Sequence, residues 1–173
     1  MNLKLQADNN RSYITLQELN NVPFDLRGIQ TKENSRIILT KDYEAFLRER
    51  EPNDFKTSFF VLTHQGNPSV ILNCYVKIEI YTDRDERDVI EIYIGTIDKS
   101  EGVYVPLYVE SADKEVNVIS VTITYLSLSG EEIRYNYDPV HLKESYSIID
   151  GENIRTIFEF NIDPVTWIFP EKR

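Results

Sequence analysis

Few side chains in this chain could support nucleophilic catalysis. Cys74 is the single cysteine, and His64 and His141 are the only histidines. A nucleophile needs a base within hydrogen-bond reach. Because Cys74 alternates in phase with Val76 and Ile78, we expect a buried and unreactive thiol. We expect His64 to face solvent ahead of a turn and His141 to lie in a loop. The sequence therefore predicts a protein that is not an enzyme, with a catalytic site assembled from distant segments as the open alternative.

Two adjacent carboxylates, Glu131 and Glu132, follow Gly130 in the stretch YLSLSGEEIRYNY at residues 125–137. A carboxylate pair that acts on a glycosidic bond faces that bond from two sides, about 5 to 9.5 Å apart. Neighbouring residues of a strand point to opposite faces, which does not suit that arrangement. Gly130 can supply the positive φ of a tight turn. The stretch therefore predicts a β-hairpin without catalytic residues.

A second acidic group lies in TDRDERD at residues 82–88, where the carboxylates are Asp83, Asp85, Glu86 and Asp88. A calcium loop of the EF-hand type needs an oxygen ligand at its fifth position and glycine at its sixth. Here arginine stands fifth and aspartate sixth. The sequence also lacks a glycine-rich phosphate loop and the HExxH and CxxC spacings. We expect a solvated loop, no metal and no cofactor.

The charge balance limits the partners of this chain. Its 19 basic and 29 acidic residues give a formal net charge of −10 over 173 residues, which repels nucleic acids and anionic membrane surfaces. No stretch reaches the roughly 18 apolar residues of a membrane span, and the N-terminus has no apolar signal core. We therefore expect no nucleic-acid partner, no membrane insertion and a cytoplasmic location.

The elements that would position these residues are mostly strands. From residue 58 onward apolar and polar residues alternate with a period of two, which is typical of half-buried strands. The alternating runs lie at residues 58–63, 72–81, 89–95, 102–109, 118–127, 131–137, 146–149 and 156–162. They predict a mostly β fold, an antiparallel two-sheet immunoglobulin-like β-sandwich of about seven to eight strands. Pro106 cannot donate to a ladder, so its strand is expected at an edge or at a bulge.

The first 57 residues differ from the rest. SRIILT at residues 35–40 indicates a strand, and TKDYEAFLRER at residues 40–50 has the pattern of a helix. Thr40 can cap that helix, Tyr43, Phe46 and Leu47 form its apolar stripe, and Pro52 ends it. We expect residues 1–57 to form a segment with a strand and a short helix, packed on a sandwich of residues 58–173.

Three stretches carry a family resemblance, and they stand in the order HQGNPSVILNCYVKIEIY, YIGTIDKSEGVYVPLYV and VISVTITYLSLSGEEIRYNYD. Over about residues 58 to 138 they resemble bacterial immunoglobulin-like domains of the adhesion type, found in uncharacterised proteins. At Ser100, Glu101 and Gly102 the usual order of glycine and glutamate is inverted. The resemblance implies a β-sandwich used for binding or spacing, and it supplies no functional residues.

The remaining candidates for function are tyrosines. The strand pattern places five of them opposite the aliphatic residues: Tyr75, Tyr81, Tyr93, Tyr104 and Tyr108. Tyrosine gives binding surfaces a large contact area at low cost in entropy, so these residues predict a protein-binding face. Two alternatives stay open, since the first 55 residues could cover this face or the tyrosines could be scattered and half exposed.

The sequence as a whole predicts a non-catalytic module that binds another protein or itself, as an accessory subunit of a bacterial or phage multi-protein system of the defence type. Exposed edge strands are a second contact surface for such a module. One alternative is a structural protein of a phage or virus, in a baseplate or beside a capsid. The other is a carbohydrate-binding or hydrolytic domain built on loop carboxylates such as Asp83, Asp85 and Asp138.

Overall fold

The computed structural model describes residues 11–23, 34–39, 41–48, 56–66, 70–81, 87–107 and 117–162 of the chain. These residues form ten strands and one helix: β1 (Ser12–Pro23), β2 (Ser35–Ile37), α3 (Lys41–Arg48), β3 (Lys56–Gly66), β4 (Val70–Tyr81), β5 (Arg87–Asp98), β6 (Gly102–Leu107), β7 (Asn117–Leu126), β8 (Glu132–Asp138), β9 (Lys143–Asp150) and β10 (Asn153–Asn161). The prediction of a mostly β chain is confirmed, and the described strands number ten where seven to eight were expected.

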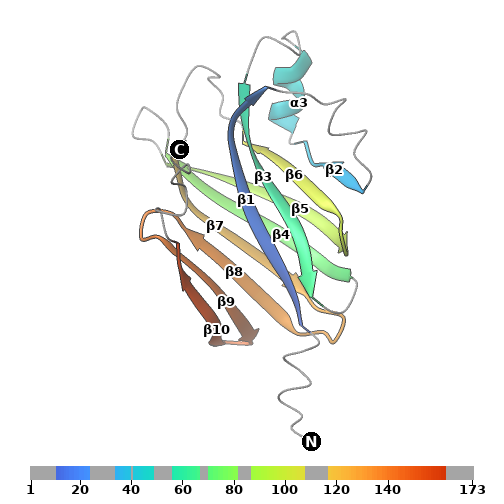
Figure 1. Ribbon diagram of the computed structural model, residues 1–173, viewed down its shortest axis with the longest axis vertical. Coiled ribbons are helices and arrows are strands. Elements are labelled where there is room, and N and C mark those ends of the chain that lie inside the picture. Colours follow the sequence, from blue (N-terminus) through green and yellow to red (C-terminus); the bar gives the residue numbers. More distant parts are fainter. Residues whose placement is uncertain are drawn as a thin grey trace, which may run out of the picture.

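The strands form two sheets that face each other (Figure 1). The smaller sheet has the order β1-β3-β6-β2, and the larger has the order β10-β9-β8-β7-β4-β5. Neighbouring strands are antiparallel except β2 and β6, which are parallel. In Figure 1 strands β1 and β3 cross in front of the larger sheet, while β9 and β10 lie to one side of β1. The larger sheet thus extends beyond the smaller one.

The core lies between the two sheets. Strand β4 shows why, because Cys74, Val76, Ile78 and Ile80 alternate along it and are all fully buried. They join one cluster with buried residues of β1, β3 and β6 from the smaller sheet and of β5, β7, β8 and β9 from the larger one. Alternation therefore predicts the buried face of β4 correctly, since a strand turns every second side chain to the same side.

The N-terminal segment is part of the smaller sheet. Strand β1 pairs antiparallel with β3 from Ser12 opposite Gly66 to Pro23 opposite Lys56, with a register shift between Leu19 and Val22. Strand β2 pairs with β6. The described residues before Lys56 therefore supply two strands, β1 and β2, to the smaller sheet. Strand β1 was not predicted from the sequence.

The predicted helix is confirmed as α3. Its Tyr43 is 1% exposed, and Arg48 donates to Glu44 one turn earlier, at 2.9 Å. Thr40 and the side chains of Phe46 and Leu47 lie outside the described residues. Within the described part of the chain, no helix has the length and apolar character that crossing a membrane requires.

Pro106 shows how the sheet accommodates proline in a strand that is not at the edge. Strand β6 lies between β3 and β2, but β2 pairs only with Gly102, Val103 and Tyr104 of it. Pro106 lies opposite Phe59 of β3, beyond the end of this pairing. The prediction of an edge strand or a bulge is therefore wrong, because β6 lies inside the sheet and its pairing with β3 is regular. Proline is tolerated because no described strand pairs with β6 on its other side at this position.

Candidate protein-binding surface

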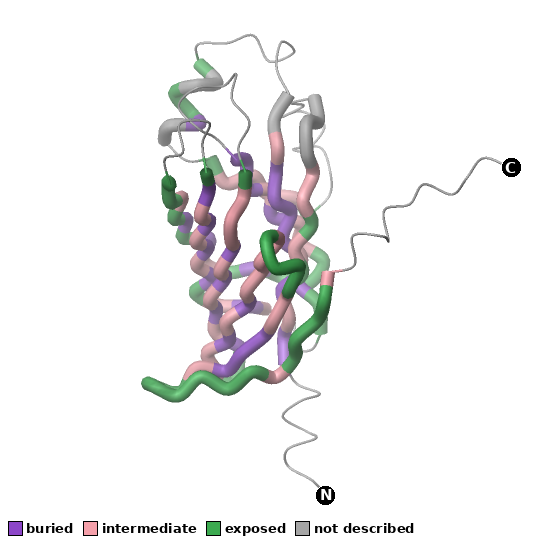
Figure 2. The backbone as a smooth tube through the Cα atoms, turned by 90° about the vertical axis from the view of Figure 1, so that its left-hand side faces the viewer, coloured by how far each residue is buried: buried purple, intermediate pink, exposed green. Residues whose placement is uncertain are grey.

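Strand β10 is the most exposed element of the larger sheet. It is bonded to β9 on one side and ends the sheet on the other. None of its nine residues is buried, and Figure 2 shows it as the nearly unbroken green strand along the lower edge of the molecule. It nevertheless carries Ile154, Phe158 and Phe160, which are 57%, 43% and 49% exposed. An edge strand with large apolar side chains is a template for pairing with another chain.

The two phenylalanines of β10 continue a row of rings that begins in the core. Ring centroids are 5.0 Å apart between Tyr135 and Tyr146, 5.2 Å between Tyr146 and Tyr13, 5.8 Å between Tyr13 and Phe158, and 6.1 Å between Phe158 and Phe160. We call these five residues the aromatic row. Edge-to-face and stacked contacts of this kind orient the rings, so the exposed phenylalanines are held in place before any partner arrives.

Two tyrosine hydroxyls of the larger sheet donate hydrogen bonds to the backbone of β1. Tyr125 donates to the carbonyl oxygen of Ser12 at 3.0 Å, and Tyr146 donates to that of Ile14 at 2.6 Å. Both carbonyls belong to β1, the last strand of the smaller sheet. Burial raises the pKa of both phenols, which keeps the hydroxyls protonated as donors. The start of β1 is therefore attached to β7 and β9. Strand β10 lies further out, where the ring of Tyr13 contacts Phe158 but leaves it 43% exposed.

Two further tyrosines, both on β8, donate to partly buried carboxylates of β1 and β9. The Tyr137 hydroxyl donates to Glu18 of β1 at 3.4 Å, and the Tyr135 hydroxyl donates to Glu144 of β9 at 2.5 Å. Burial, and after it the charge of Glu18, raises the pKa of Tyr137 to about 12. The contact of Tyr137 with Glu18 adds to the attachment of β1 to the larger sheet, whereas the contact of Tyr135 with Glu144 lies within the larger sheet.

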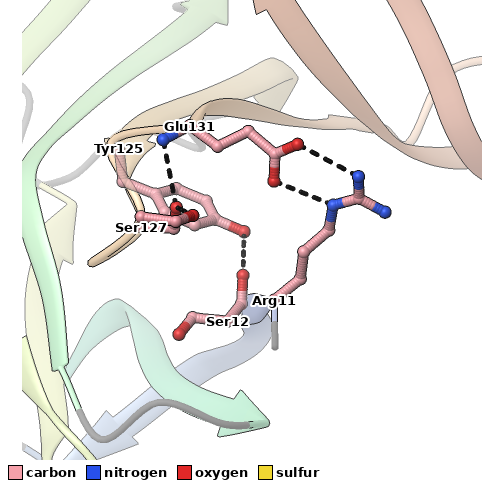
Figure 3. A network of polar contacts seen from close by, with 6 residues as sticks. Arg11, Ser12, Tyr125, Ser127 and Glu131 are labelled. Atoms are coloured by element: carbon pink, nitrogen blue, oxygen red, sulfur yellow. Dashed lines mark hydrogen bonds and ion pairs between the residues drawn. The ribbon is translucent and has the colours of Figure 1, made fainter. Parts of the chain in front are cut away.

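The turn with the two glutamates is a hairpin that holds the start of β1 (Figure 3). Arg11 is 5% exposed, and its Nε and Nη2 donate to the two carboxylate oxygens of Glu131 at 2.8 and 3.0 Å. The hydrogen bond to Glu131 raises the pKa of Arg11. Ser127 Oγ accepts from the Glu131 amide at 3.1 Å, and Gly130 has a φ of 79°. The predicted hairpin is confirmed, and Glu131 acts as an anchor for Arg11.

The predicted tyrosine face is divided between the sheets. Tyr75 and Tyr93 lie opposite each other on β4 and β5, and Tyr93 donates to Asn73 Oδ1 at 3.2 Å. Tyr93 and Tyr81 are 66% and 45% exposed, while Tyr75 is half-buried. Tyr104 belongs to β6 of the smaller sheet, where its ring packs edge-on against Phe59. Tyr108 lies outside the described residues.

The residues considered for catalysis differ in their surroundings. Cys74 is buried as predicted, and burial raises its pKa to about 12. The prediction for His64 is wrong: it is 2% exposed, because β3 continues to Gly66 and pairs His64 with Ile14. Its ring nitrogens have no hydrogen-bond partner among the described residues, and burial lowers its pKa. His141 lies in an exposed turn as predicted, 2.7 Å from Asp138 through Nδ1.

Of the carboxylates considered for metal or sugar binding, Asp88 and Asp138 lie in the described part of the chain. Asp83 and Asp85 lie outside the described residues. A hollow of about 630 Å³ lies between the β7–β8 and β9–β10 turns and is lined by Glu131, Glu132, Asp150 and Arg155, among others. Its Glu131 is engaged by Arg11. Among the residues that the structure describes, no group of three His, Cys, Asp or Glu side chains is arranged to hold a metal ion.

The sequence predicts β10 as a strand but does not show that its apolar face is exposed. The alternation of Phe158, Phe160 and Ile162 looks the same as that of a buried strand, and no local signal shows that the facing sheet ends short of it. Comparisons with protein-family models, with curated proteins and with solved structures found no significant match to the chain.

Proposed function

We propose that this chain is a non-catalytic protein-binding module of immunoglobulin-like type, an accessory subunit of a larger assembly, and that it contacts its partner through strand β10. The observation that carries the proposal is the combination of a sheet edge with which no described strand pairs and two exposed phenylalanines, Phe158 and Phe160, that are oriented by the aromatic row. Addition of an extended segment to such an edge gives affinity through main-chain hydrogen bonds and specificity through alternate side chains.

The geometry defines the kind of segment that would fit. Phe158 lies opposite Tyr146 of β9 and Phe160 lies opposite Glu144, two positions along, so both rings are on the side of the sheet that faces β1. A partner strand would therefore place apolar side chains at every second position on this side. The exposed fractions leave about 180 Å² of the two rings to be covered, taking roughly 200 Å² for a whole ring.

Selection from a library of displayed random nine-residue peptides against the immobilised full chain tests the proposal. Selected peptides should carry alternating apolar residues and should lose about 50-fold in affinity for the Phe158→Ser/Phe160→Ser variant, if half of the apolar burial is realised as binding free energy. Tyr93→Ser is the matched control, because it removes an exposed ring from the other end of the same sheet.

Two results decide between the surfaces. Peptides that bind the wild-type chain and the double variant equally well would refute β10 as the contact. Loss of binding in the Tyr93→Ser variant, with binding retained by the double variant, would move the contact to the outer face of β4 and β5, where Tyr75 and Tyr93 are paired.

A further inference from the structure

The local charge of β10 is unusual for this acidic chain. A net charge of −10 drives two copies apart, so self-association requires a contact that is locally neutral. Strand β10 carries one arginine, Arg155, and one glutamate, Glu159. The Glu159 carboxylate already accepts from Lys143 Nζ at 3.2 Å. The strand edge thus adds no net charge to a contact between two copies.

The end of β10 is also self-complementary. The β9–β10 register shifts between Thr156 and Phe158 and is regular from Phe158 to Asn161. Ile162 continues the pairing, since its N–H donates to the carbonyl of Leu142 at 2.8 Å. In this stretch Phe158, Phe160 and Ile162 share one face, because successive side chains of a strand alternate.

Antiparallel pairing of two such stretches about a twofold axis at Phe160 places compatible residues opposite each other. Phe160 then meets its own copy, Phe158 meets Ile162, and Glu159 meets Asn161. Apolar residues lie opposite apolar residues, and no like charges face each other. A twofold axis at Glu159 would place two carboxylates opposite each other. A twofold axis midway between two residues would pair side chains that point to opposite faces of the sheet.

We infer that β10 pairs with β10 of a second copy of this chain, antiparallel and with Phe160 on the twofold axis, which joins two larger sheets into one continuous sheet. This inference rests on the proposed function, whose contact surface it shares, and it names the partner. Such a twofold contact uses the same residues on both copies.

The size of the contact indicates how strongly the copies bind. Four phenylalanine rings, two from each copy, would cover roughly 370 Å² at their observed exposure. Stable dimers usually bury more than about 1,200 Å² in total. The dimer should therefore be reversible and depend on protein concentration, with the monomer as the main species in dilute solution.

Disulfide formation in a Phe160→Cys variant tests the register. Residues directly opposite in an antiparallel pair have Cα atoms about 4.5 to 5.5 Å apart, which suits a disulfide. Oxidised glutathione is the oxidant: the two thiols become one disulfide, and each glutathione disulfide consumed yields two reduced glutathiones. Cys74 does not interfere, because it is buried. Thr156→Cys is the control, since its two copies would lie about 27 Å apart in this register.

The expected result is a cross-linked dimer for Phe160→Cys and none for Thr156→Cys, together with a light-scattering mass of the wild-type chain that rises towards the dimer between about 10 µM and 1 mM. The Phe158→Ser/Phe160→Ser variant should stay monomeric throughout. A wild-type chain that stays monomeric, with no cross-link at position 160, would overturn the inference, and the peptide selection would still decide the proposed function. A double variant that dimerises like the wild type would also overturn it, because the dimer would then use another surface.

Discussion

Replacement of Glu131 by glutamine removes the charge that holds Arg11 and keeps the shape of the side chain. Arg11 is 5% exposed and Glu131 is 25% exposed, so the guanidinium would stay largely buried beside a neutral amide. Hydrogen bonds to charged groups contribute about 1.5 to 3 kcal/mol. Leaving one charge of a fully buried ion pair without its counter-charge costs about 3 to 5 kcal/mol. The partial exposure of Glu131 places the expected loss of unfolding free energy at about 2.5 kcal/mol.

Urea unfolding followed by circular dichroism measures this loss. The midpoint should fall while the slope stays constant, because the strands themselves do not change, and Tm should fall by about 5 to 10 °C for a chain of this size. Glu132→Gln is the control, since it makes the same change in net charge one residue further along and should cost less than about 0.5 kcal/mol. A double-mutant cycle with Arg11→Met should give a coupling energy of about 2 kcal/mol.

Equal effects of Glu131→Gln and Glu132→Gln, or a coupling energy near zero, would refute this stabilisation by the ion pair. Either outcome would mean that the ion pair between Arg11 and Glu131 adds nothing to the attachment of β1. Besides the pairing with β3, the tyrosine hydroxyls that donate to Ser12 and Ile14 would then hold the start of this strand.

Three more predictions concern single buried groups. Tyr146→Phe leaves the Ile14 carbonyl without its donor and should lower the free energy of unfolding by about 1 to 2 kcal/mol, whereas Tyr81→Phe, at an exposed position, should change it by less than about 0.5 kcal/mol. Burial lowers the pKa of His64 in the folded chain, so the unfolded chain takes up the proton first as pH decreases. The contribution to stability is fully present above the unfolded pKa of about 6.5 and falls as pH decreases below it. A His64→Leu variant should therefore lose less free energy of unfolding than the wild type between pH 7.5 and 5.5, and equal losses would contradict this. Cys74, with a pKa raised to about 12 by burial, should resist a thiol-specific reagent at pH 8 in the folded chain and react at once in urea, and rapid labelling of the folded chain would show that the core opens at β4.

Particular elements show how far the sequence predicts the fold. Strand β4 was predicted together with its buried face, because alternation records which side is apolar. Strand β1 was missed, since two adjacent asparagines interrupt its pattern and its partner β3 begins more than thirty residues later. The exposure of His64 was predicted wrongly because the alternating run ends at residue 63, while pairing with β1 extends the strand to Gly66.

The candidate site shows the same limit. The sequence by itself determined most strands from residue 58 onward, their apolar faces and the hairpin at Gly130, because these depend on residues a few positions apart. Only the tertiary structure decided that β1 ends the smaller sheet above β9, that Arg11 binds Glu131 from 120 residues away, and that Phe158 and Phe160 are left uncovered. Alternation shows that a face is apolar, but what covers that face depends on the packing of segments distant in the chain.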